Sequence, residues 1–135
     1  MSTEIHLNPR LVIERLNRAT NEHDVDAFVD CFDQLYRTEQ PLHPDRGYRG
    51  RDKLRRVWAE TFKRLPDFRV DVIRTAVDHN VVWMEARWTG TQHDKVKVEL
   101  VGVLIFGVRD NRIIWSRAYM EPLQHPGAGI EAVAG

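Results

Sequence analysis

The spacing of apolar residues changes once along this chain, close to Pro66, and that change constrains the fold more than any other feature. Before Pro66, apolar residues recur at steps of three and four, which is the spacing of one face of an α-helix. After Pro66 they alternate with polar residues, as expected for strands. Helices followed by a run of strands predict an α+β domain rather than alternating strand–helix units.

Three helices are expected before the change of spacing. The first covers residues 8–22, where Asn8 can cap the helix and Pro9 occupies its first turn. Asp24 can cap a shorter second helix, which should form a hairpin with the first. The third helix covers residues 51–65 and ends where a proline follows.

One strand is expected between the helices, over residues 34–40, followed by a loop that prolines and a glycine interrupt. The remaining strands should form a meander over residues 67–78, 81–91, 95–108 and 112–121. The steps Asp78-His79-Asn80 and Asp110-Asn111 are typical of tight turns between antiparallel strands.

Both faces of the meander carry apolar residues. In one strand, a set with Val82, Met84, Ala86 and Trp88 alternates with a set of Trp83, Glu85, Arg87 and Thr89. Three helices can cover one side only, and an uncovered antiparallel sheet normally shows a polar side. The second side should therefore meet a partner, most simply another copy of the chain in a two-fold homodimer. The alternative is that scattered apolar residues are exposed there.

The charge balance argues against polyanionic partners. Lys plus Arg and Asp plus Glu both total 20, so no net field gathers phosphates or an anionic membrane. Apolar runs are far shorter than the roughly 20 residues that span a bilayer, and the first residues do not resemble a signal peptide. We therefore expect a cytoplasmic protein that binds neither nucleic acid nor membrane. The single cysteine, Cys31, is expected in the core.

Three short motifs point to one superfamily. They are Gly50-Arg51-Asp52-Lys53-Leu54, Thr89-Gly90-Thr91, and Asp110-Asn111-Arg112-Ile113 followed by Arg117, Tyr119 and Glu121. In this order they resemble motifs of the superfamily of nuclear transport factor 2 and SnoaL-like polyketide cyclases. The resemblance covers about residues 8–123, so we expect a SnoaL-like domain over residues 1–123 and a flexible tail over residues 124–135.

The resemblance implies a cone in which a curved, mostly antiparallel sheet wraps a long helix and encloses an apolar cavity. Superfamily members include isomerases, cyclases, dehydratases, epoxide hydrolases and non-catalytic binding modules, so the fold alone names no reaction. We expect a cofactor-independent acid–base enzyme that acts on a small apolar metabolite. The alternative is a ligand-binding or dimerisation module without turnover.

Glu121 is the first candidate for the acid or base, because it resembles the acidic position at the end of the last strand in the superfamily's cyclases and epoxide hydrolases. Glu85 and Arg87 align with a charged pair of the limonene-type epoxide hydrolases, in reversed order. Residues two apart on a strand share a face, so Glu85 as carboxylate partner and Arg87 as orienting cation are expected in the cavity. The alternatives are a cross-strand salt bridge at the solvated side and, for Glu121, a charge at the rim.

The expected ligand-binding residues are mostly aromatic. They are Trp58, Trp83, Tyr36, Tyr119 and Phe62, together with His43 at the cavity mouth and Glu39 on the first strand. A tyrosine hydroxyl can hold a developing oxyanion, whereas the alternative for the other rings is that they fill a core. The histidines lack the helical four-residue spacing of a zinc site, so no metal is expected, and the sequence has no Gly-rich phosphate loop, so no cofactor is expected either.

Overall fold

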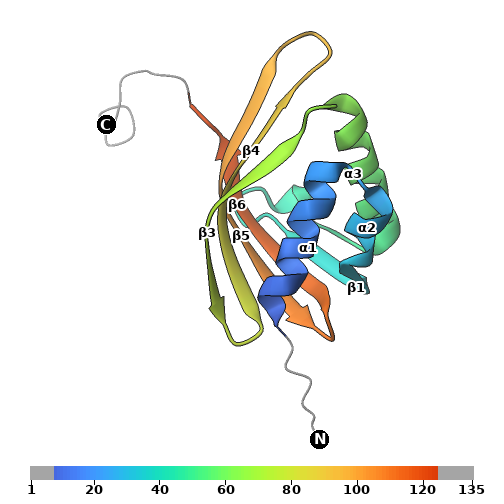
Figure 1. Ribbon diagram of the computed structural model, residues 1–135, viewed down its shortest axis with the longest axis vertical. Helices are drawn as coiled ribbons and strands as arrows, with labels where there is room; N and C mark the ends of the chain where they lie inside the picture. Colours follow the sequence, from blue (N-terminus) through green and yellow to red (C-terminus); the bar gives the residue numbers. More distant parts are fainter. Residues whose placement is uncertain (1–7, 125–135) are drawn as a thin grey trace, which may run out of the picture.

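The secondary-structure elements of the computed structural model, which describes residues 8–124, follow the order expected from the sequence (Figure 1). The helices are α1 (Pro9–Glu22), α2 (Val25–Asp30) and α3 (Arg51–Arg64), with a 3₁₀ turn η1 (Pro44–Arg46). The strands are β1 (Phe32–Glu39), β2 (Tyr48–Arg49), β3 (Arg69–Asp78), β4 (Val81–Thr91), β5 (Lys97–Arg109) and β6 (Arg112–Pro122). The α+β class is confirmed, while nearly all of the expected C-terminal tail lies outside the described residues.

The signals at the helix ends act as predicted. Asn8 Oδ1 accepts a hydrogen bond from the backbone N–H of Arg10 at 3.1 Å, and Asp24 Oδ1 accepts one from Ala27 at 3.0 Å. Between α1 and α2, His23 is left-handed with φ 55°, and its N–H donates to carbonyls of the last turn of α1. These caps end one helix and begin the next within a few residues, which produces the hairpin.

One curved sheet contains the strands in the order β2-β1-β6-β5-β4-β3. Neighbouring strands are antiparallel except β1 and β6, which are parallel. The turns use left-handed residues, with φ 55° at His79, 52° at Asp110 and 62° at Asn111, as tight hairpin turns require. The sequence predicts an irregular loop where η1 and β2 lie, because a strand of two residues is too short to show alternation.

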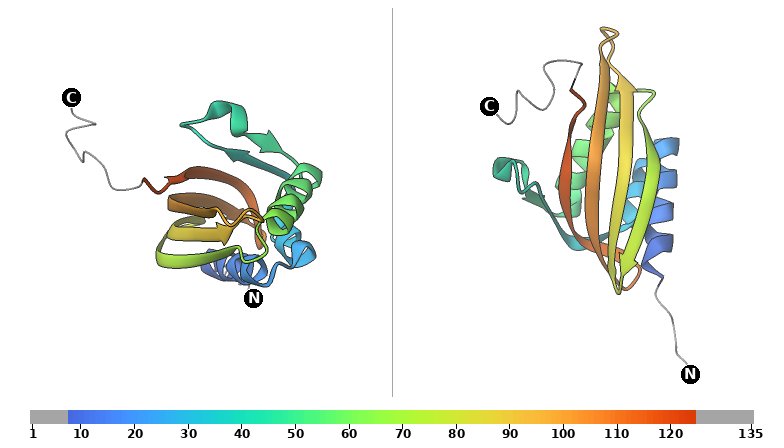
Figure 2. Two further views of the ribbon diagram at one scale, coloured as in Figure 1. Left: turned by 90° about the horizontal axis from the view of Figure 1, so that it is seen from above. Right: turned by 90° about the vertical axis from the view of Figure 1, so that its left-hand side faces the viewer.

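The helices cover one face of the sheet and leave the opposite face open (Figures 1 and 2). In β4, Val82, Met84 and Ala86 are buried on the covered face, whereas Trp83 is 47% exposed on the open face. At the far edge, β1 and β2 lie beside α3, away from β3 (Figure 2). None of the helices within residues 8–124 combines the length and the hydrophobicity needed to cross a bilayer.

Aromatic rings form much of the core between α2, α3 and the start of β1. The ring of Phe28 lies 4.7 Å from that of Trp58 and 5.3 Å from that of Phe32, centroid to centroid. Phe62 extends the same cluster from α3. Burying each such side chain contributes roughly 1.5–3 kcal/mol. Cys31 is buried in this core as predicted, and burial raises the pKa of its thiol.

Candidate functional site

A partly enclosed, mostly apolar cavity of about 250 Å³ lies between the covered face of the sheet and the helices. Its apolar walls include Leu16, Phe28, Trp58, Met84, Trp88 and Leu104. Ligand pockets are concave, mostly apolar and typically about 300–1,000 Å³ in volume. The cavity therefore has the character of a ligand site but suits a small molecule.

A larger and more open cleft, of about 780 Å³, lies where α3 begins. Its walls include the charged side chains of Arg49, Arg51, Asp52, Lys53, Arg55 and Arg56. Most of these are exposed, and Arg55 Nη1 pairs with Asp26 Oδ1 at 2.7 Å. A wide charged surface of this kind is readily solvated, so the smaller apolar cavity is the better candidate for a small-molecule site.

Three hydroxyl groups form a polar cluster in the wall of the cavity. Tyr36 Oη lies 2.6 Å from Ser116 Oγ, and Thr38 Oγ1 lies 3.0 Å from the same oxygen. Tyr36 and Thr38 are two residues apart in β1 and therefore share a face. The parallel pairing of β1 with β6 places Thr38 opposite Ser116, which is only 3% exposed.

This cluster contains more donors than its own hydrogen bonds use. The three hydroxyls carry three protons, but two hydrogen bonds among them use only two. Whichever way the bonds run, one proton is left, and within residues 8–124 no other acceptor bonds to these hydroxyls. The cavity wall thus holds one hydrogen-bond donor available to an acceptor oxygen of a bound molecule.

The tyrosines of the cavity remain protonated at neutral pH. Burial raises the pKa of the Tyr36 hydroxyl, and its hydrogen bond with Ser116 and the nearby hydroxyl of Thr38 only partly oppose that effect. Burial also raises the pKa of Tyr48, which lines the cavity from β2. Because a raised pKa favours the neutral hydroxyl, both groups act as hydrogen-bond donors rather than as bases.

Glu85 and Arg87 lie on the open face of the sheet and not in the cavity, which corrects the prediction for both. Arg74 Nε lies 2.9 Å from Glu85 Oε1, and Arg87 Nη1 lies 3.1 Å from Glu99 Oε2. These cross-strand ion pairs lie at the solvated side, as the alternative interpretation has it, but Glu85 and Arg87 pair with residues of other strands and not with each other. Alternation in β4 groups the two residues correctly, but it does not indicate which face the helices cover.

The same ambiguity explains the errors for Trp83 and Tyr119. Both were predicted to line the cavity, yet they are 47% and 36% exposed on the open face. Glu39 is exposed and lies opposite Arg117, also away from the cavity. These positions depend on which set of each strand the helices cover, and the alternation alone does not indicate that.

Two of the predicted lining residues do reach the cavity. Tyr36 and Trp58 are part of its wall. Phe62 is buried in the core, with its ring centroid 5.9 Å from that of Trp58, and is not among the lining residues. Phe62 therefore fills the core, which was the alternative interpretation of these rings.

His43 and Glu121 form a pair near the end of β6. His43 Nε2 lies 2.8 Å from Glu121 Oε2, and the two side chains are 35% and 48% exposed. Glu121 shares the open face with Arg87, but Val101 lies between them in the strand register. Glu121 therefore has an imidazole partner in place of the expected carboxylate and guanidinium.

Several cavity residues escape sequence reasoning. Ser116 and Ala118 line the cavity from β6, and Thr38 and Arg64 line it from β1 and α3. The sequence holds one signal for them: in β6, the small residues Ser116 and Ala118 alternate with Arg117 and Tyr119. Small side chains on the covered face of a sheet leave space for a cavity. Within residues 8–124, no three or more His, Cys, Asp or Glu side chains gather where they could hold a metal ion.

The family model of the SnoaL-like domain matches residues 13–115, which is most of the chain. The chain belongs to the SnoaL-like domain family. The curved sheet and the helices on one face of this SnoaL-like domain agree with the superfamily resemblance of its motifs. No functionally curated protein is similar enough in sequence to match it.

Solved structures with the same fold are distant in sequence from this SnoaL-like domain. An LEH-like epoxide hydrolase of M. tuberculosis has 19% identity and a TM-score of 0.74 over 84% of this chain and 82% of that one. A proposed ketosteroid isomerase from Kribbella flavida has 20% identity and a TM-score of 0.70 over 93% and 86%. A proposed SnoaL-like polyketide cyclase from Shewanella denitrificans has 12% identity and a TM-score of 0.72 over 84% and 90%. At these identities the likeness establishes the fold alone.

Proposed function

We propose that this SnoaL-like domain binds a small, largely apolar molecule in the cavity and anchors one acceptor oxygen of that molecule on the Tyr36–Ser116–Thr38 cluster. The observation that carries the proposal is the hydroxyl proton that the cluster's two hydrogen bonds leave without a partner. A carbonyl oxygen is the simplest acceptor for it. The raised pKa of Tyr36 supports this role, because the hydroxyl stays neutral and can donate.

The proposal can be tested with a ketone and its hydrocarbon isostere. Trp58 and Trp88 line the cavity, so tryptophan fluorescence reports its occupation. We expect 2-octanone to bind about threefold to tenfold more tightly than 2-methyl-1-octene, since a net hydrogen bond contributes about 0.5–1.5 kcal/mol. Equal affinities for the two molecules would contradict the anchoring role of the cluster.

A blocking substitution tests where the ligand binds. Ala118 lines the cavity, so Ala118→Phe should fill part of it and abolish binding. The matched control is Ala76→Phe, because Ala76 is exposed and pairs with Trp83 on the open face. Circular dichroism of both variants establishes that each is folded. If Ala118→Phe binds the ketone as the parent protein does, the ligand lies elsewhere.

A second candidate function is catalysis, and the His43–Glu121 pair favours it. An imidazole hydrogen-bonded to a carboxylate can take up a proton and pass it on. Glu121 is on the open face and neither side chain lines the cavity, but Gln40 and Met120, which are close to the pair in sequence, do line it, so the pair lies at the rim. We infer a cofactor-independent acid–base reaction of the bound molecule: isomerisation, cyclisation, dehydration or epoxide hydrolysis. Two of the fold's structural neighbours are described as an epoxide hydrolase and a proposed ketosteroid isomerase, which supports this class of reaction.

Proton exchange at the carbon next to a carbonyl tests the catalytic proposal. We expect the protein to accelerate hydrogen–deuterium exchange of 2-octanone, measured by NMR in D₂O. Glu121→Gln should reduce that acceleration by on the order of 10²-fold, the lower range for a general acid or base. Glu99→Gln is the control, since Glu99 forms an exposed ion pair with Arg87 on the open face. An unchanged rate in Glu121→Gln would remove Glu121 from the reaction.

The open face of the sheet is the proposed interface of a homodimer. Trp83 is exposed there, and Val103 and Val101 of β5, which pair with Glu85 and Arg87, are partly buried on the same face. The apolar side chains of this area lie among the Arg74–Glu85 and Arg87–Glu99 ion pairs, and exposed apolar groups with a polar rim are typical of a protein contact. A two-fold arrangement would place this area against the same area of a second copy.

A further inference from the structure

One charged side chain takes part in the wall of the cavity. Among the described residues that line it, Arg64 alone carries a charge, and it is exposed to solvent at the same time. Arg64 therefore lies at the mouth of the cavity rather than deep inside it. A guanidinium is permanently charged at neutral pH and presents planar N–H donors that match a carboxylate.

Arg64 and the hydroxyl cluster lie toward opposite ends of the cavity. Arg64 ends α3, and the next residue, Leu65, packs against Gly90, which pairs with Val98 in β5. Ser116 instead pairs with Phe106 of the same strand. Val98 and Phe106 both line the cavity, and roughly 25 Å of extended strand separates them. The long side chains of Arg64 and Tyr36 shorten the gap that a ligand must span.

The charge of Arg64 is not neutralised by the surrounding protein. Within residues 8–124, every carboxylate found in an ion pair has a partner other than Arg64. The other described residues of the cavity wall carry no carboxylate that could provide one. The site therefore combines an apolar middle, a neutral donor at one end and a free cation at its mouth.

We propose that the ligand of this cavity is an amphiphilic oxo acid, with its carboxylate on Arg64, an apolar chain along the walls and a carbonyl oxygen at the Tyr36–Ser116–Thr38 cluster. This inference rests on the proposed binding function and specifies its ligand class. Guanidinium and carboxylate can form two parallel N–H···O bonds, which are stronger than bonds between neutral groups. Arg64 is in this view a specificity-determining residue, since it selects acids over neutral molecules of the same shape.

A pair of probes that differ only in charge tests the inference. Tryptophan fluorescence titrations would use 9-oxodecanoic acid and its primary amide, with shorter and longer homologues to match the cavity length. We expect the parent protein to bind the acid about threefold to tenfold more tightly than the amide, the range expected for a partly exposed charge-assisted contact. In Arg64→Gln that preference should vanish while the affinity for the amide stays unchanged.

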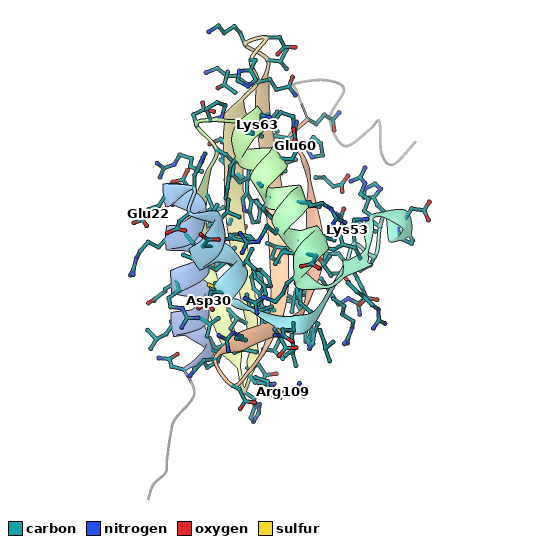
Figure 3. The ribbon with its side chains drawn as sticks, turned by 90° about the vertical axis from the view of Figure 1, so that its right-hand side faces the viewer. Glu22, Asp30, Lys53, Glu60, Lys63 and Arg109 are labelled. Carbon is teal, nitrogen blue, oxygen red and sulfur yellow. The ribbon has the colours of Figure 1, made fainter. Side chains whose placement is uncertain are left out.

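The control variant is Lys63→Gln. Lys63 precedes Arg64 on α3, is exposed, and is labelled near the C-terminal end of that helix in Figure 3. It is not among the lining residues of the cavity, so this variant removes the same charge without touching the site. Lys63→Gln should keep the preference for the acid.

The outcomes separate the two proposals. If the acid and the amide bind the parent protein equally, the inference about Arg64 is overturned while the binding function stands. If Arg64→Gln and Lys63→Gln lose the preference to the same extent, the effect is one of general charge and the inference is again overturned. If no homologue of either probe binds at all, both the proposed binding function and the inference about Arg64 are overturned.

Discussion

Replacing Ser116 with alanine should destabilise the protein more than replacing Tyr36 with phenylalanine. Ser116 Oγ is the common partner of both hydrogen bonds in the cluster. Both substitutions remove a single oxygen and leave the packing nearly unchanged. Tyr36→Phe removes one bond and leaves Ser116 paired with Thr38, which corresponds to a loss of about 0.5–1.5 kcal/mol.

Ser116→Ala removes both bonds and leaves the hydroxyl of Tyr36 without its partner. Tyr36 is only 4% exposed, and an unsatisfied buried polar group costs about 1–3 kcal/mol. In the double variant that hydroxyl is absent, so its loss of stability should be smaller than the sum of the two single losses, by on the order of 1 kcal/mol.

Urea unfolding of the parent protein, both single variants and the double variant measures this coupling. For a domain of this size, each kcal/mol also lowers the melting temperature by roughly 3–6 °C, so thermal unfolding provides a second reading. Strictly additive losses, or a Ser116→Ala loss no larger than that of Tyr36→Phe, would refute the arrangement of the hydroxyl network and the donor count derived from it.

Three further predictions concern other parts of the molecule. A methyl group on Gly107 would overlap Nε1 of the Trp115 ring, so Gly107→Ala should lower the free energy of unfolding in urea by about 1–3 kcal/mol; an unchanged midpoint would contradict this. Trp83→Glu should convert the proposed dimer into a monomer, as measured by light scattering. A parent protein that is itself monomeric would refute the proposed homodimer. Hydrogen bonds from Thr91, through its side-chain hydroxyl and its backbone N–H, lower the pKa of Asp67 below its ordinary 3.8. Ionised Asp67 therefore contributes its full stabilisation above pH 3.8, and this contribution is lost as the pH falls through the pKa of the folded state. The difference in unfolding free energy between the parent protein and Asp67→Asn should accordingly shrink in acid; a difference that stays constant with pH would contradict this.

Much of the fold could be predicted because its signals are local. Asn8 and Asp24 cap their helices through bonds that span only two or three residues, and the left-handed turn lies at Asp110 and Asn111, residue types that tolerate this conformation. The helix caps, the proline after α3 and the alternation of the strands are all signals that act over a few neighbouring residues of the sequence. The short strand β2 was missed because its existence depends on pairing with β1.

The composition of the site was harder to predict than the fold. Alternation correctly separates Trp83, Glu85 and Arg87 from Met84 and its companions, but both sets contain apolar residues. Only the docking of the helices selects the covered set, and that choice reverses the predicted positions of the charged pair. Glu121 retains a proposed role because the loop after β1 brings His43 to it, a contact that strand periodicity does not encode.

By itself, the sequence determined the order and approximate bounds of the helices and the long strands, and which residues of each strand share a face. The tertiary structure alone decided which of the two faces encloses the cavity and which residues meet there. Tyr36 and Ser116 are 80 residues apart in the chain and meet only through the parallel pairing of β1 and β6. The physical reason is that a strand's period fixes directions relative to its own backbone, whereas inside and outside are defined by what packs against it.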